Sequence, residues 1–154
     1  MPTNIKPIPE GYHSVTPYLV CRNASDAIEF YKKAFNAIEI MRMADPGGKI
    51  GHAEIMIGDS RIMLADEFPD MNALSPESIG GSPVSLMLYV EDVDKRFELA
   101  VQAGATVSRP LENKFYGDRT GSLLDPFGHT WHLASRVEIL TNEEIEQRMK
   151  SEMD

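Results

Sequence analysis

The pair His52 and Glu54 carries the clearest chemistry in the sequence. Both residues belong to the aliphatic run 49–57, which reads as a strand, so they share one face and lie about 7 Å apart along it. An imidazole and a carboxylate at this spacing either supply two ligands to a divalent cation or form a polar pair that binds substrate. The third interpretation is a pair of solvent-exposed residues without a role. The pattern is weaker than the helical H-E-x-x-H motif, in which the spacing itself sets the ligand geometry.

Four further residues are candidates for contact with a small molecule. An imidazole titrates near neutral pH, so His132 is a general base, a hydrogen-bond partner, or a lining residue with no catalytic role. Arg61 and Arg119 are the cations best placed to hold a carboxylate or phosphonate, and exposed salt bridges of little energy are the alternative. Tyr116 lies in the loop before the last hairpin, where it is placed to cover a bound ligand.

The composition excludes several classes of protein. The 24 acidic against 15 basic residues give a formal net charge of -9, which disfavours nucleic-acid binding. The single cysteine, Cys21, excludes an intrachain disulfide, and no apolar run approaches the roughly 18 residues of a membrane helix. Neither a G-x-S-x-G turn nor a Gly-rich nucleotide loop occurs. We therefore expect a cytoplasmic protein that binds neither nucleic acid nor membrane and has no nucleotide cofactor.

The first half of the chain predicts a strand, a helix and three further strands. Pro17 places the first strand at an edge or a bulge, and Asn23 or Ser25 caps the helix, whose apolar residues recur at helical spacing. The two-residue turn Gly58-Asp59 predicts a hairpin. These elements cover residues 14–21, 23–35, 37–43 and 49–65, and the turn-rich linker 66–82 follows without periodicity.

The same order of elements recurs in the second half. A strand at 83–90 precedes a helix that begins near Val93 and ends near Gly104. A strand at 105–113 is interrupted by Pro110, and two more strands flank the turn at Asp125. Met63 and His132 are 69 residues apart, and the same offset relates the opening strands and the helices of the two halves. This single offset predicts an internal duplication. A short charged helix over 141–150, with a capping box at its start, ends the chain.

The segments PYLVC, DAIEFYKKAF, GHAEIMIGDSRIMLADE and GDRTGSLLDPFGHTWHLA resemble the PhnB-like branch of the glyoxalase/bleomycin-resistance/extradiol-dioxygenase superfamily, over roughly residues 14–138. The resemblance implies an α+β fold in which two βαβββ modules form a curved, partly open mixed barrel around one cavity, with homodimers usual. We thus expect one domain over 1–138, built of repeats 14–66 and 83–135 joined by linker 67–82, and a charged C-terminal helix over 139–154.

The resemblance also identifies four positions at which metal-dependent relatives place His or Glu. They correspond here to Thr16, Met63, Ser85 and His132, of which only His132 is a competent ligand. The usual metal site is therefore expected to be absent, and no cofactor is predicted. A divalent metal at a displaced site, formed by His52, Glu54 and His132, is the remaining alternative.

Strand alternation then predicts which side chains face the cavity. In the first hairpin Ile55, Ile57, Ile62 and Leu64 face the helices, and the alternate residues face the cavity. The 69-residue offset makes Gly121 and Leu123 equivalent to His52 and Glu54, and places Arg119 on the same row. Catalysis, where it occurs, is assigned to His132 and Glu54, and ligand contact to His52, Arg61, Met63, Arg119, Tyr18, Ser85 and Tyr116.

Three functions remain open at this point. The first is a small-molecule-binding protein of bleomycin-resistance type with a metal-free cavity. The second is a divalent-metal-dependent lyase or isomerase of glyoxalase type with a rearranged site. The third is a dimeric module that binds a protein partner. The missing metal ligands favour the first function over the second.

Overall fold

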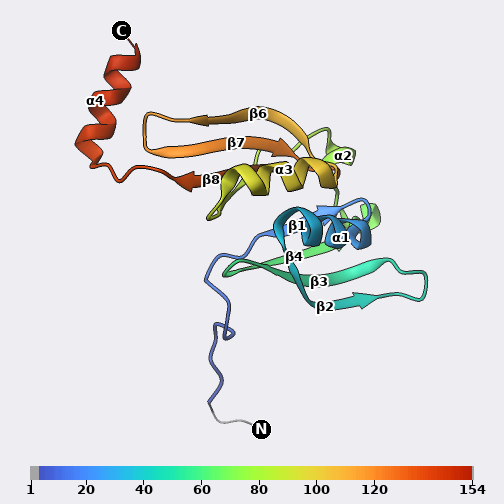
Figure 1. The fold of residues 1–154 in the computed structure, drawn as a ribbon. Coiled ribbons are helices and arrows are strands. Elements are labelled where there is room, and N and C mark those ends of the chain that lie inside the picture. The colour runs from blue at the N-terminus through green and yellow to red at the C-terminus, as the bar shows by residue number, and fades with distance from the viewer. Residues whose placement is uncertain (1–3, 154) are drawn as a thin grey trace. The chain divides into compact units, whose positions relative to one another are not determined.

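The chain divides into two compact units, residues 1–80 and 81–154, and the computed structural model describes residues 4–153. Each unit contains one four-stranded mixed sheet, with strand orders β1-β4-β3-β2 and β5-β8-β7-β6 (Figure 1). The first and fourth strands of each module pair in parallel, and the other neighbours are antiparallel. Neither sheet closes on itself. The predicted α+β class with two βαβββ modules is confirmed, while a cavity shared by the modules stays a prediction.

The first unit begins its sheet later than expected. Its predicted strand from residue 14 starts only at Tyr18, because the ring of Pro17 leaves no N–H for the ladder; the Pro17 carbonyl still accepts a hydrogen bond from the N–H of Met63 at 3.0 Å. The elements are β1 (Tyr18–Cys21), α1 (Ala24–Phe35), β2 (Ile38–Ala44), β3 (Ile50–Ile57) and β4 (Ser60–Asp66).

Asn23, not Ser25, caps α1. Its side chain accepts a hydrogen bond from the backbone N–H of Asp26 at 3.2 Å. The buried carboxylate of Asp66 accepts from the N–H groups of Ala24 at 2.8 Å and Ile50 at 2.7 Å. One side chain at the end of β4 therefore fixes the start of the helix against the start of β3.

The first hairpin has the predicted register. Glu54 pairs with Met63 and Ile57 pairs with Ser60, across the two-residue turn Gly58-Asp59. Ile55 and Leu64 are consequently buried on the face that α1 covers, and Glu54 and Met63 lie on the other face. Burial of the aliphatic face is the main stabilising term here, since apolar area removed from water contributes about 25 cal/mol per Å².

The segment after β4 is more ordered than its sequence indicates. A 3-10 turn η1 (Pro69–Met71) and a short helix α2 (Pro76–Ile79) lie within the predicted linker. Ser75 caps α2 through the N–H of Ser78, and Pro76 occupies the first helical position. Glu67 accepts from the hydroxyl of Ser78 at 2.7 Å and from the N–H of Ser75 at 3.0 Å. The segment is thereby attached to the end of the first sheet.

Glu67 predicts a specific acid sensitivity. Its hydrogen bonds from Ser78 and Ser75 lower the pKa of this carboxyl to about 2. Because the folded-state pKa lies below the ordinary value of 4.5, the stabilisation is complete above pH 4.5 and is lost as the pH falls toward 2. We expect the difference in thermal midpoint between the native protein and Glu67→Gln to be largest near pH 7 and to shrink below pH 4.5. An unchanged difference at pH 3 would contradict this; Glu77→Gln is the exposed control.

The second unit repeats the arrangement and adds a terminal helix. Its elements are β5 (Ser85–Tyr89), α3 (Val93–Ala103), β6 (Thr106–Asn113), β7 (Asp118–Leu124), β8 (Thr130–Arg136) and α4 (Asn142–Met153). The end of α3 at Gly104 is as predicted. The Thr141 hydroxyl accepts from the N–H of Glu144 at 3.1 Å, which is the first of the two hydrogen bonds of the predicted capping box.

The offset between the modules is not uniform. Tyr18 pairs with Met63 and Met87 pairs with His132, so the offset of 69 residues holds for the first and last strands. In the third strand it drops to 68, because the turn between β7 and β8 is one residue longer than the first turn. The predicted equivalence of Gly121 and Leu123 with His52 and Glu54 is therefore wrong. The equivalent residues are Thr120 and Ser122.

Candidate functional site

Four side chains form one row across the second sheet. Arg109 on β6 pairs with Ser122 on β7, Ser122 pairs with His132 on β8, and His132 pairs with Met87 on β5. On β7 the alternate residue Gly121 faces α3, where an added Cβ would lie 2.7 Å from the ring of Phe97. The row therefore lies on the sheet face that α3 leaves open.

His132 is held by hydroxyl groups on both sides. The Ser122 Oγ lies 2.6 Å from its Nδ1 and the Ser85 Oγ lies 2.9 Å from its Nε2. Each hydroxyl can donate or accept, so both neutral tautomers of the imidazole are satisfied. Among residues 4–153, no carboxylate is hydrogen-bonded to the ring. This environment suits a hydrogen-bonding role for His132 better than a role as general base.

The row borders a pocket of about 230 Å³ within the second unit. Two cationic side chains, Arg109 and Lys114, line it together with the phenol of Tyr116. Lys114 also forms an ion pair with Glu112, whereas the Arg109 side chain has no ion pair or hydrogen bond among residues 4–153. The full lining is Met87, Arg109, Pro110, Lys114, Tyr116, Thr120, Gly121, Ser122 and His132. A positive lining without an acid, in a chain of net charge -9, fits a small anion.

A β-bulge explains why Arg109 was missed in the sequence. Between Val107 and Arg109 the ladder advances two residues on β6 against one on β7. The bulge sits beside Pro110, and it sets Arg109 opposite Ser122. The only signal for it in the sequence was the proline. Lys114, in the turn after β6, carried no periodic signal.

The first unit brings Tyr18, His52 and Glu54 together. The Tyr18 hydroxyl lies 2.8 Å from Nδ1 of His52, and Nε2 of His52 lies 2.8 Å from a carboxylate oxygen of Glu54. Burial raises the pKa of the Tyr18 phenol. His52 and Glu54 share one face of β3, as predicted, and their side chains are in direct contact.

The two predicted arginines are engaged elsewhere. The Arg61 guanidinium lies 5.0 Å from the ring centroid of Tyr12, next to Gly11, in a cation–π contact. Arg119 donates to Asp94 at the start of α3 at 2.8 Å and lowers the pKa of that carboxyl. Arg119 shares its face of β7 with Gly121 and Leu123, as predicted, but this is the face toward α3 and not the open face. The longer turn shifts β7 by one residue and so reverses the predicted assignment of faces.

The donors at the four metal positions that the resemblance implies do not fit a divalent cation. Met63 lies beside Glu54 and Tyr18 in the ladder, and Ser85 is hydrogen-bonded to His132. With Thr16, the set contains a single imidazole and no carboxylate, which is short of the three protein ligands of a catalytic zinc. Among residues 4–153 no group of three His, Cys, Asp or Glu side chains is arranged to hold a metal ion.

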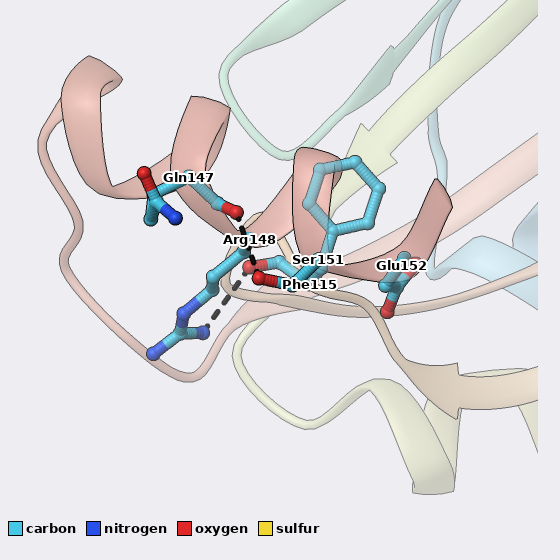
Figure 2. Close-up of a pocket in the computed structure, with 5 residues that line it drawn as sticks. All are labelled: Phe115, Gln147, Arg148, Ser151 and Glu152. Carbon is cyan, nitrogen blue, oxygen red and sulfur yellow. Dashed lines mark hydrogen bonds between the residues drawn. The ribbon is translucent and has the colours of Figure 1, made fainter. Parts of the chain in front are cut away.

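A second hollow in this unit, of about 360 Å³, lies against α4 (Figure 2). Arg148 donates to the carbonyl oxygen of Phe115 at 3.1 Å and to the Glu138 carboxylate at 2.8 Å. Ser151 donates to the carbonyl oxygen of Gln147 at 3.1 Å. These polar groups are hydrogen-bonded to one another, and the bond from Arg148 to Phe115 attaches α4 to the turn before β7.

In the part of the chain that the structure describes, no helix is both long and apolar enough to cross a membrane. The cytoplasmic location and the homodimer stay predictions from the sequence.

Comparison with known proteins gives a consistent result. A family model described as Glyoxalase/Bleomycin resistance protein/Dioxygenase superfamily matches residues 11–133. An uncharacterized protein of Mycobacterium bovis is 41% identical over 157 residues, covering 100% of this chain and 99% of its own length. The X-ray structure of a gene product from Arabidopsis thaliana is 28% identical, with a TM-score of 0.65 over 80% of this chain and 98% of that chain.

Two further solved structures are similar in fold. TioX from Micromonospora sp. ML1 is 22% identical, with a TM-score of 0.64 over 84% of this chain and 100% of that chain. A PhnB protein from Bacillus cereus is 20% identical, with a TM-score of 0.63 over 80% of this chain and 99% of that chain. At these identities the likeness concerns the fold alone.

Proposed function

The chain belongs to the glyoxalase/bleomycin resistance/dioxygenase superfamily, and we propose that it binds a small organic anion in the pocket of the second unit, without a metal ion. The observation that carries this proposal is the convergence of Arg109 and Lys114 with Tyr116, Ser122 and His132 around one pocket. The cations attract a carboxylate or phosphonate, and the hydroxyl and imidazole groups supply directional hydrogen bonds to its oxygens.

The donor chemistry supports the metal-free form of this proposal. A glyoxalase-type lyase or isomerase needs a cation to polarise its substrate. Here Met63 replaces one expected ligand, and the hydroxyl of Ser85 is already hydrogen-bonded to His132. We therefore assign His132 to ligand contact. The metal-dependent enzyme is retained only as an outcome of the test below.

The test is a thermal-shift titration with benzoate, methylphosphonate and inorganic phosphate, after metal analysis of protein purified without chelator. A ligand at 100 times its dissociation constant stabilises the folded state by about 2.7 kcal/mol, which is several degrees for a chain of this size. Arg109→Gln should weaken binding of the best anion about tenfold, because one charge-assisted hydrogen bond contributes about 1.5 kcal/mol. Lys114→Gln should act in the same direction.

Lys95→Gln, on α3 and outside the pocket lining, is the matched control, since it removes one positive charge elsewhere. An equal loss of anion affinity in Lys95→Gln and Arg109→Gln would show that only the net charge matters. That result would contradict binding in the pocket. Stoichiometric metal that is lost in His132→Ala would favour the metal-dependent enzyme. No shift with any anion would leave a protein-interaction module as the better account.

A further inference from the structure

Tyr18, His52 and Glu54 form a continuous row of hydrogen bonds in the first unit, and none of the three lines the pocket of the second unit. An ionised carboxylate can only accept, so Nε2 of His52 donates to Glu54 at 2.8 Å. In the neutral imidazole Nδ1 is then the unprotonated nitrogen and accepts from the Tyr18 hydroxyl at 2.8 Å. The contacts therefore fix one tautomer of His52 and one direction of proton donation.

The residues that pair with His52 and Glu54 in the sheet are apolar. Met43 pairs with His52 on one side, and Met41 and Met63 flank Glu54 on its two neighbouring strands. Methionine side chains adapt to the shape of an apolar ligand body. Among residues 4–153, Tyr18 is 49% exposed, whereas the His52 and Glu54 side chains retain 21% and 14% of their exposure. Tyr18 is thus the most exposed of the three residues.

We propose that Tyr18, His52 and Glu54 form an acid–base site that exchanges a proton with a hydroxyl or carbonyl group of an apolar small molecule. When Tyr18 Oη takes a proton from the substrate, its own proton passes to Nδ1 of His52, and Glu54 balances the imidazolium charge. The reverse transfer returns the proton, so no oxidant or other reactant is required. Tyr18 is the catalytic residue in this scheme, and Glu54 is a positioning residue.

The site is tested with N-acetylimidazole, a small acylating probe, at pH 7.5. The Tyr18 Oη–acetyl bond forms and the phenol proton goes to His52. The acetyl–imidazole bond breaks, and the departing imidazole takes a proton from solvent. Tyr89 is the internal control, because it is 60% exposed and its hydroxyl donates to Asp118 at 2.7 Å. A carboxylate is a much weaker proton acceptor than an imidazole. Peptide mass spectrometry should show Tyr18 acetylated at least about tenfold faster than Tyr89.

His52→Asn keeps a hydrogen-bond acceptor near Tyr18 but removes the base, so acetylation of Tyr18 should fall to the rate of Tyr89. Glu54→Gln should slow the acetylation of Tyr18 several-fold. It should also move the nitrogen-15 signals of His52 away from those typical of the Nε2–H tautomer. Equal rates for Tyr18 and Tyr89 in the native protein would overturn the proposal. If a variant fails to fold, the nitrogen-15 signals of His52 in the native protein test the proposal instead. An Nδ1–H tautomer would contradict it, because Nδ1 could then not accept from Tyr18. Anion binding in the second unit is a separate readout, so the two proposals fail independently.

Discussion

Asp125→Ala is expected to lower the free energy of unfolding by about 3–5 kcal/mol. The Asp125 side chain is 3% exposed, and its Oδ1 accepts from the N–H groups of Phe127 and His129, each at 2.9 Å. Its Oδ2 accepts from the indole N–H of Trp131, also at 2.9 Å. Hydrogen bonds to a charged group contribute about 1.5–3 kcal/mol each, and the substitution leaves three buried donors without this partner.

Chemical unfolding followed by fluorescence measures this effect at the site itself, because Trp131 is the single tryptophan. The control is Asp59→Ala, in the exposed turn of the first hairpin, where within residues 4–153 the carboxylate accepts only from Ser60 Oγ, at 3.0 Å. We expect Asp59→Ala to stay within about 0.5 kcal/mol of the native protein. Equal midpoints for the two variants would show that Asp125 does not hold the turn.

Gly121→Ala is expected to destabilise the second unit by about 1–3 kcal/mol. A Cβ at this position would lie 2.7 Å from the Phe97 ring and 3.1 Å from both the carbonyl oxygen of Arg109 and the N–H of Leu111. Two of the three neighbours are backbone atoms of β6, so the strain cannot be relieved by rotating a side chain. Because Gly121 also borders the pocket of the second unit, a shift of β6 should weaken binding of the proposed anion as well.

The matched control is Gly51→Ala on β3. An added Cβ there would lie 3.9 Å from its nearest neighbour, the carbonyl oxygen of Met43, which is ordinary contact. Alanine in a strand interior also loses less conformational freedom on folding than glycine, by about 0.5 kcal/mol or more. Urea unfolding should therefore show Gly51→Ala unchanged or stabilised. If Gly51→Ala were destabilised as much as Gly121→Ala, close packing around Gly121 would not explain the effect of Gly121→Ala.

The first module was predictable because its hairpin turn leaves little choice. A two-residue turn at Gly58-Asp59 sets the register, and the aliphatic residues then decide which face is buried. His52 and Glu54 were correctly placed together for this reason. Their contact with Tyr18 was not foreseen, since it depends on the parallel pairing of β1 with β4.

The faces of the strands in the second module were harder to predict from the sequence, for a physical reason. Its turn is closed by the side chain of Asp125, whose bonds to the turn's N–H groups make it one residue longer than the first turn. An offset taken from the last strands therefore fails for β7, and Arg119 was assigned to the wrong face. Arg109 reached the open face through a bulge that alternation alone does not reveal.

The most direct test of the anion pocket is a titration of isotope-labelled protein with the tightest-binding anion of the panel, in the presence of EDTA. We predict that amide signals shift around Ser122, His132 and Tyr116, which border the pocket, and that saturation is reached without metal. Shifts confined to Arg119 and Asp94 beside α3, or binding that EDTA abolishes, would contradict the account.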